Sequence, residues 1–277
     1  MRRYVALLML PPCVLSACGD DQAAPSQGSS PTEPPARYTS TVTVLENPHH
    51  GPELCVSVVL ESYPPQCGGV PVEGWDWSSV EFEHAIGVSW GEYTVTGTFD
   101  GERLTLTEPA RPPKTEAPPE NERLGTPCPA PPGGWTVVDR ASSMNGYAGL
   151  DAVAGYTTAQ PDHAATWLDG AVLNVAFTGD VDRHEQTLRS IWGGALCVST
   201  AERSSSELDA IGAELGYGTD PNVLGWSADG RRGIVIVGVV VDDGFQAEMD
   251  LRWGPDVIDV WPALRPVDEL ARPSPDP

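Results

Sequence analysis

The hydrophobic pattern changes twice along the chain. A short apolar run, residues 4–10, follows Arg2 and Arg3 at the start. Between about 38 and 108, apolar and polar residues alternate with a period of two in several short runs, which is typical of strands with one buried face. From about 134 to 268, strand-like runs alternate with runs of helical period. The pattern therefore predicts an apolar leader, an all-β segment and a segment that mixes strands with helices.

The segment 38–108 is predicted to be a small β-barrel. Strand candidates follow one another with little between them: Thr41–Val44, Leu54–Leu60, Val70–Trp77, Tyr93–Phe99 and Arg103–Thr107. The last two flank Asp100-Gly101, a hairpin signal in which both turn residues are expected at positive φ. Five short strands favour a closed or half-closed barrel that resembles the oligonucleotide/oligosaccharide-binding (OB) fold.

The segment 134–268 is predicted to be α+β. Ser204 and Glu207 have the spacing of a capping box at a helix start. Helices are expected over Asp182–Trp192 and along the stripe of Phe245, Met249 and Trp253, and strands over Ala195–Thr200, Val223–Ser227 and Val257–Trp261. The unbroken apolar run Ile234–Val241 predicts a central strand buried on both faces.

An internal repeat supports this assignment. Gly170–Gly193 and Gly233–Gly254 each run from a strand through an aspartate into a helix that ends in Trp-Gly, and another strand follows each. We therefore expect repeated βαβ units whose helices cover one face of a sheet. The whole chain is predicted to be α+β: a small N-terminal five-stranded OB-like β-barrel followed by a C-terminal α+β sandwich.

The segments between these modules differ in composition. Residues 18–37 are rich in Gly, Ser, Pro and Gln and predict a flexible tether. Nine prolines fall within 109–133, which predicts a stiffer Pro-rich linker. Residues 269–277 predict a disordered tail, and residues 1–17 a leader.

The leader ends in Leu15-Ser16-Ala17-Cys18, small residues directly before a cysteine. This matches a lipobox, and the chain is similar to bacterial lipoproteins. The resemblance implies cleavage of the signal peptide 1–17 and attachment of a diacylglycerol to Cys18, with palmitate among the acyl chains. The expected location is the extracytoplasmic face of the cell membrane. A cut without lipid is the alternative, and the apolar run is too short to span a bilayer.

Four of the six cysteines then remain, because Cys13 lies in the leader and Cys18 carries the lipid. An even number in an exported chain indicates disulfides, with three possible pairings. We favour Cys55–Cys67 and Cys128–Cys197, since the first pair falls inside one module. Free buried cysteines are the alternative. Metal binding is disfavoured because no Cys-x-x-Cys spacing occurs.

The formal net charge is −23, from 39 acidic and 16 basic residues. Such a surface repels nucleic acid and anionic headgroups, so we expect no nucleic-acid partner and an attachment to the membrane through the acyl chains alone. No phosphate loop and no Gly-x-Ser-x-Gly motif occurs in the sequence. We expect no cofactor, no metal and no catalytic residues, so the protein is not predicted to be an enzyme.

Aromatic residues supply one candidate binding surface. Trp75 and Trp77 are two residues apart and would share one face of a strand. They could form a stacking platform for a sugar or a peptide, although a place in the barrel core is favoured. His49-His50 is weaker as a metal site, because neighbouring strand residues point to opposite faces.

Three further motifs resemble the pro-regions of secreted chymotrypsin-like proteases of the α-lytic protease and streptogrisin type. They are Arg203–Asp209 (RSSSELD), Ala164–Asp169 (AATWLD) and Gly225–Asp229 (GWSAD), and the similarity covers roughly residues 160–245. In that family the pro-region folds its protease and then blocks it. The protease domain is absent here, because the sequence contains no Gly-Asp-Ser-Gly-Gly motif. The layout around 61–67 and 74–77 also resembles lipoproteins of high-GC Gram-positive bacteria, a similarity that implies no activity.

Three functional hypotheses follow. The first is a non-enzymatic lipoprotein that binds a protein or cell-wall partner outside the membrane. The second is an inhibitor or folding helper of a secreted chymotrypsin-like protease, acting in trans through an exposed strand edge at Val257–Trp261. The third is an enzyme with an unrecognised site, which we rank last.

Overall fold

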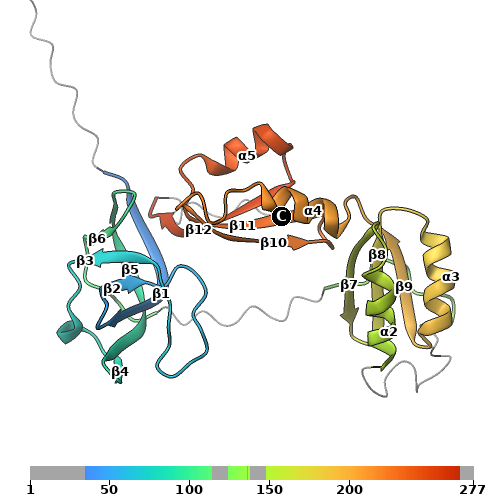
Figure 1. Ribbon diagram of the computed structural model, residues 1–277, viewed down its shortest axis with the longest axis horizontal. Helices are drawn as coiled ribbons and strands as arrows, with labels where there is room; N and C mark the ends of the chain where they lie inside the picture. Colours follow the sequence, from blue (N-terminus) through green and yellow to red (C-terminus); the bar gives the residue numbers. More distant parts are fainter. Residues whose placement is uncertain (1–34, 114–123, 136, 138–147, 269–277) are drawn as a thin grey trace, which may run out of the picture. The chain divides into compact units, whose positions relative to one another are not determined.

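The computed structural model describes residues 35–113, 124–135, 137 and 148–268. They form an α+β structure with a closed five-stranded barrel, further strands and four α-helices (Figure 1). The described part of the chain contains no helix that is long and apolar enough to cross a membrane. The predicted leader 1–17 and Cys18 lie outside the described residues.

Five strands close the barrel: β1 (Arg37–Asn47), β2 (His50–Leu54), β3 (Val70–Glu73), β5 (Val88–Phe99) and β6 (Leu104–Leu106). The order is β1-β2-β3-β6-β5, and β5 returns to pair along β1. β3 and β6 are parallel, and the other neighbours in the barrel are antiparallel. Alternate residues point inward, so Val44, Leu54, Val95 and Leu104 are fully buried in its core. β4 (Glu83–Ala85) adds to the outer side of β5.

Three details of the barrel differ from the sequence-based prediction. The strand expected over Leu54–Leu60 does not form: β2 covers His50–Leu54 and shares only Leu54 with that range. The strand expected over Val70–Trp77 ends at Glu73, because Gly74 turns the chain at φ 82°. The Asp100-Gly101 hairpin forms, but Gly101 alone of the pair has positive φ. The carboxylate of Asp100 accepts the backbone N–H groups of Glu102 and Arg103 and holds the turn in this form.

A three-stranded sheet contains β7 (His163–Asp169), β8 (Val172–Phe177) and β9 (Ala195–Thr200). β7 and β8 form an antiparallel pair, and α3 (Val181–Ile191) connects β8 to the parallel strand β9. α3 and α2 (Ala148–Thr157) pack on the same face, where they bury Leu188 and Val153 against the sheet. No helix was expected at the position of α2.

The other face of this sheet is covered by residues 124–135, which we call the strap. Cys128 and Trp135 pack against Val172, Ala195 and Cys197 on the sheet. The indole of Trp167 donates to the carbonyl of Gly125 at 2.8 Å. The prolines here were expected to form a linker; they are exposed, but Cys128 and Trp135 attach this part of the segment to the sheet.

A second set of elements has the same order. β10 (Val223–Asp229) and β11 (Ile234–Val241) are antiparallel, and α5 (Phe245–Trp253) leads to β12 (Ile258–Pro266), which is parallel to β11. α4 (Ser205–Ala213) begins with the predicted capping box. Leu208 of α4 and Met249 of α5 pack on one face of the strands. β11 is an inner strand, although Ile236 and Gly238 on its second face are half-exposed.

The last strand joins the first. Pro266 and Arg265 at the end of β12 pair with Tyr38 and Thr39 of β1, so the barrel strands and β10–β12 belong to one nine-stranded sheet. The sequence predicted two separate modules, and it carries no local signal for a pairing between residues so far apart in the chain. Leu264 of β12 is consequently buried in the barrel core cluster.

Candidate functional site

The segment between β2 and β3 leaves the barrel as a long loop (Figure 1). A disulfide between Cys55 and Cys67 closes it, with a Cα–Cα distance of 5.5 Å. We call residues 55–67 the clasped loop. It exposes large apolar side chains: Val58 is 76% exposed, Leu60 54% and Tyr63 75%. Apolar side chains that gather on an exposed segment mark a binding surface more often than a structural role.

The base of the clasped loop is fixed to the barrel. Cys55 is buried with Leu45 and Trp90, and Cys67 packs against the same cluster. The N–H of Cys55 donates to the carbonyl of Thr43 at 2.8 Å. Just beyond the loop, a Cβ at Gly69 would collide with the carbonyl of Leu54, so glycine is needed for this close approach of two backbones.

Hydrogen bonds within the clasped loop hold its tip. The N–H of Leu60 donates to the carbonyl of Gln66 at 2.9 Å. The hydroxyl of Ser62 donates to the carbonyl of Pro64 at 2.8 Å and accepts from the amide of Gln66 at 3.2 Å. Glu61 lies between these two anchored residues, and its side chain is exposed. The Tyr63 ring meets Trp90 edge-on, with ring centroids 5.7 Å apart.

The predicted platform of Trp75 and Trp77 has a different geometry. Both residues lie beyond the end of β3, in the loop and in a 3₁₀ turn, so they do not share a strand face. Their rings meet edge-on with centroids 5.1 Å apart and pack against the barrel core, as does the ring of Tyr93. A hollow of about 360 Å³ beside Trp75 is lined by Gly74, Ser79, Leu106, Pro109 and Ala110. The arrangement is that of a core edge, which was the favoured alternative.

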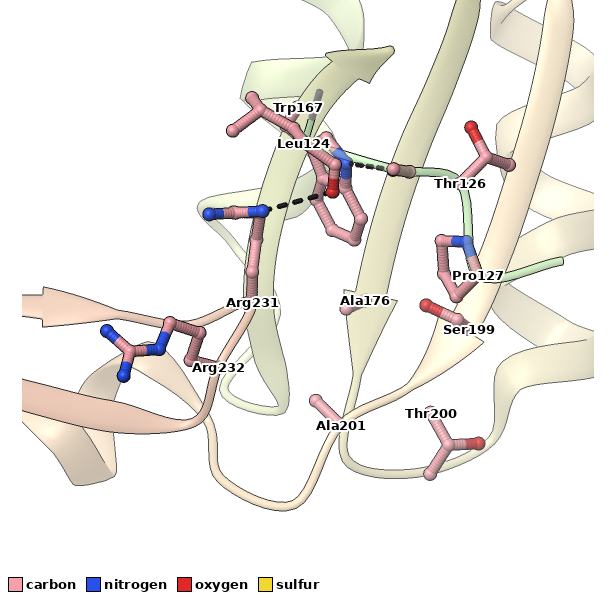
Figure 2. Close-up of a pocket in the computed structure, with 11 residues that line it drawn as sticks. Leu124, Thr126, Pro127, Trp167, Ala176, Ser199, Thr200, Ala201, Arg231 and Arg232 are labelled. Atoms are coloured by element: carbon pink, nitrogen blue, oxygen red, sulfur yellow. Dashed lines mark hydrogen bonds between the residues drawn. The ribbon is translucent and has the colours of Figure 1, made fainter. Parts of the chain in front are cut away.

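A second hollow, of about 330 Å³, lies at the end of the strap (Figure 2). The Trp167 ring and Ser199 line it from the sheet, and Arg231 and Arg232 line it from the turn between β10 and β11. Arg231 donates to the carbonyl of Leu124 at 3.0 Å, and Arg232 pairs with Asp259 at 3.1 Å. Both arginines therefore fasten the turn to neighbouring segments, which leaves them less free to hold a ligand.

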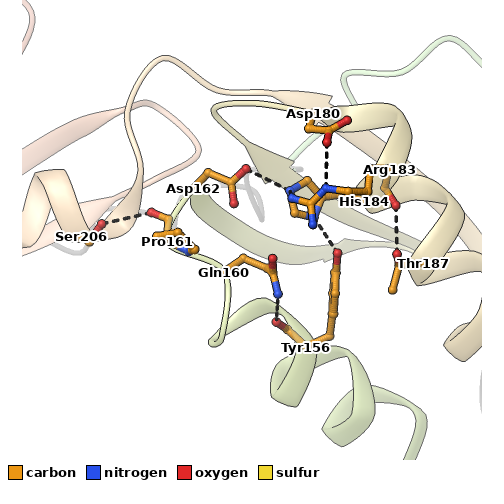
Figure 3. Close-up of polar contacts among 9 residues, drawn as sticks. All are labelled: Tyr156, Gln160, Pro161, Asp162, Asp180, Arg183, His184, Thr187 and Ser206. Atoms are coloured by element: carbon orange, nitrogen blue, oxygen red, sulfur yellow. Dashed lines mark hydrogen bonds and ion pairs between the residues drawn. The ribbon is translucent and has the colours of Figure 1, made fainter.

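Three polar residues meet beneath α2 and α3 (Figure 3). Nδ1 of His184 lies 2.7 Å from the Tyr156 hydroxyl, and Nε2 lies 2.9 Å from a carboxylate oxygen of Asp162. A carboxylate behind an imidazole is the arrangement that orients a general base. Here, however, both ring nitrogens are bonded, His184 is fully buried, and its ring stacks on Phe177 at 3.7 Å. The network connects two helices and the segment before β7, and it exposes no reactive atom of His184.

Tyr156 and Asp162 precede His184 by 28 and 22 residues, and no local spacing in the sequence indicates that the three residues meet. Asp180 occupies the N-cap position of α3 at φ 44° without a side-chain capping hydrogen bond, and its carboxylate pairs with Arg183.

The environment shifts two neighbouring pKa values. Burial acts to raise the pKa of Asp162, but the hydrogen bond from His184 and the charges of His184 and Arg183 outweigh it, so the pKa is lowered. Burial lowers the pKa of His163, although the hydrogen bond with the backbone of Ala165 opposes this. The two shifts favour the ionised form of Asp162 and the neutral form of His163.

The strand edge proposed for protease binding is partly occupied. The side-chain amide of Gln246, in α5, donates to the carbonyl of Ile258 and accepts from the N–H of Val260, both at 2.9 Å. Pro262 has no N–H to offer a partner strand. On β9, Arg189 similarly donates to the carbonyl of Leu196 at 3.0 Å. Gln246 therefore takes one carbonyl and one N–H of the edge that was expected to be open at Val257–Trp261, which leaves this edge only partly available to a partner strand.

The four cysteines form the two favoured pairs. Cys128 and Cys197 have a Cα–Cα distance of 5.7 Å, and their bond attaches the strap to β9. In the described ranges, no group of three or more His, Cys, Asp or Glu residues is placed to hold a metal ion. His50 bonds Asn47 at 2.6 Å and the carbonyl of Gly51 at 2.8 Å, which gives this histidine a turn-stabilising role.

Comparison with family models, with curated proteins and with solved structures finds no match to the chain. The site must be judged from its own geometry. On its geometry the clasped loop is the best candidate for a binding site, because it combines exposed apolar side chains with a fixed backbone. The sequence signal for this loop is the run Val56–Leu60, apolar apart from Ser57, between Cys55 and Cys67.

Proposed function

We propose that the protein is a lipid-anchored binding protein on the extracytoplasmic face of the membrane, without catalytic activity, which contacts a protein or cell-wall partner through the clasped loop. The observation that carries the proposal is the exposure of Val58, Leu60 and Tyr63 on a loop fixed at both ends by a disulfide. A fixed loop loses little conformational entropy when a partner binds it, which favours affinity.

The location rests on two further points. The lipobox at Cys18 provides the anchor, and two disulfides support an oxidising compartment. We further propose that the barrel is OB-like. The order β1-β2-β3-β6-β5, closed between β1 and β5 with a parallel β3–β6 pair, supports this assignment. The shared element order around α3 and α5 supports a duplicated βαβ unit.

The absence of catalysis is part of the proposal. Both nitrogens of His184 are engaged, its ring is covered by Phe177, and the arginines beside the strap bond to the protein itself. These contacts support structural roles for the two polar clusters. The loop, by contrast, directs its largest apolar side chains into solvent.

The test is partner capture by crosslinking on intact cells that display the full chain. We expect Val58→Asp combined with Leu60→Asp to abolish the captured species, because two charges would be buried in an apolar contact. Ile86→Asp is the matched control, since Ile86 is also apolar and 82% exposed but lies outside the loop. Equal capture by the loop variant and the wild type would exclude the clasped loop as the binding surface.

A further inference from the structure

The tip of the clasped loop presents one peptide bond, Glu61–Ser62, with the backbone anchored on both sides. Leu60 is bonded to Gln66 before it, and Ser62 is bonded to Pro64 and Gln66 after it. The side chains of Leu60, Glu61, Ser62 and Tyr63 are all exposed. A run of consecutive exposed side chains around one fixed bond is the form in which an endopeptidase cleft receives a substrate, several residues to each side of the bond that reacts.

The disulfide alters the outcome of an attack on that bond. If the serine of a peptidase attacks the Glu61 carbonyl, the C–N bond to Ser62 breaks, the proton passes to the Ser62 amine, and Glu61 becomes an acyl ester of the enzyme. The new amine cannot leave, because Cys55–Cys67 and the bonds of Gln66 keep it beside the ester. A tethered amine has a very high effective concentration, so it attacks the ester, restores the peptide bond and releases the serine hydroxyl.

Glu61 identifies the class of enzyme. Its neighbours in the loop are apolar or uncharged, with Val58, Val59 and Leu60 before it and Ser62 and Tyr63 after it. The carboxylate is therefore the single charge that the tip offers, and it suits a primary pocket lined by cations. We infer that the clasped loop is a substrate-like inhibitory loop for exported serine endopeptidases that cleave after acidic residues. This inference rests on the proposed function, because it names the partner of the same surface.

A lipid surface is the competing occupant for exposed apolar residues of a protein with a lipid anchor. The observations favour a protein cleft over a membrane. A charged Glu61 stands in the middle of the apolar run, and the chain carries a net charge of −23, which anionic headgroups repel. The hydrogen bonds that fix the backbone at Leu60 and Ser62 favour binding in a cleft of defined shape, whereas insertion into a fluid bilayer does not require a fixed backbone.

The experiment measures inhibition of a glutamate-specific serine endopeptidase by the full chain, with a chromogenic peptide as reporter. We expect reversible inhibition. Glu61→Lys should weaken it by about 100-fold or more, because a buried charge then faces a like charge, and should create inhibition of a lysine-specific serine endopeptidase. Glu248→Lys is the matched control: this exposed glutamate lies on α5, outside the loop, and the variant should behave as the wild type in both assays.

Several results would overturn the inference. One is an absence of inhibition by the wild type together with an inert Glu61→Lys variant. Another is rapid and complete cleavage at Glu61–Ser62 by mass spectrometry without inhibition, which makes the loop an ordinary substrate. A third is binding of the wild type to phosphatidylcholine vesicles that Leu60→Asp abolishes. If peptidases are unaffected but cell-surface capture still depends on Val58 and Leu60, the proposed function stands and this choice of partner fails.

Discussion

Removal of the two disulfides should destabilise the fold by different amounts. The pairs Cys55–Cys67 and Cys128–Cys197 close segments with sequence separations of 12 and 69 residues. A crosslink stabilises mainly by restricting the unfolded chain, and the effect grows slowly with the length that it closes. From this relation we expect a loss of about 3 kcal/mol for Cys55→Ala with Cys67→Ala and about 4 kcal/mol for Cys128→Ala with Cys197→Ala.

Packing contributes at both disulfides. Cys55 and Cys67 pack with Leu45 and Trp90, and Cys128 and Cys197 pack with Val172 and Ala195. Opening either bond therefore exposes some apolar surface to water as well as relaxing the chain. Because both clusters are small, the expected difference between the two variants comes from the length of chain that each bond closes.

Urea unfolding of the three proteins, followed by tryptophan fluorescence, measures the free energies. The first variant should retain a cooperative transition and still lose peptidase inhibition, since its loop is no longer fixed. The second should lose more stability and keep the inhibition. If the Cys55–Cys67 variant is the less stable of the two, the chain-entropy account of these bonds is refuted.

Three smaller predictions test other parts of the structure. Ser204→Ala should cost about 1 kcal/mol in urea unfolding, because it removes the capping box of α4, and Ser190→Ala, which is exposed on α3, should cost little by comparison. The pKa of His163 is lowered in the fold, so its contribution to stability is complete above the unfolded pKa of about 6.5 and is lost as the pH falls through the folded pKa. The free energy of unfolding of His163→Gln should therefore fall less between pH 7 and pH 5 than that of the wild type. An equal fall in both proteins would exclude His163 as the cause. Gln246→Ala should free the edge of β12 and produce concentration-dependent association in sedimentation velocity, whereas a strictly monomeric variant would show that the amide does not guard the edge.

Local signals in the sequence predicted local structure well. Ser204 and Glu207 form the capping box, and the stripe of Phe245, Met249 and Trp253 becomes α5 with Met249 buried. Such features depend on residues three or four apart, whose geometry the chain itself fixes. The number of barrel strands was also anticipated, although β2 lies before the run Leu54–Leu60 that was expected to form it.

Contacts between distant segments could not be predicted in this way. The pairing of β1 with β12 joins Tyr38 to Pro266, and no feature of the sequence near either residue indicates that they pair. The prediction that Trp75 and Trp77 share a face was wrong for a related reason. Residues two apart share a face only within a strand, and β3 ends before Gly74, which has φ 82°. The strap was misassigned because proline content indicates a stiff backbone and does not say whether that backbone packs on something.

The edges and the loop together constrain how this protein meets a partner. Sheet-edge addition needs free backbone groups in a row, and on β12 Gln246 takes one carbonyl and one N–H while Pro262 removes a further donor. The clasped loop has the opposite character: its polar backbone groups near the tip are satisfied internally, and its side chains are exposed. A surface of this kind is recognised through side chains in a shaped cleft. At Ile258 and Val260 the edge of β12 is therefore less available to a partner strand, whereas the exposed side chains of the clasped loop remain free to enter a cleft.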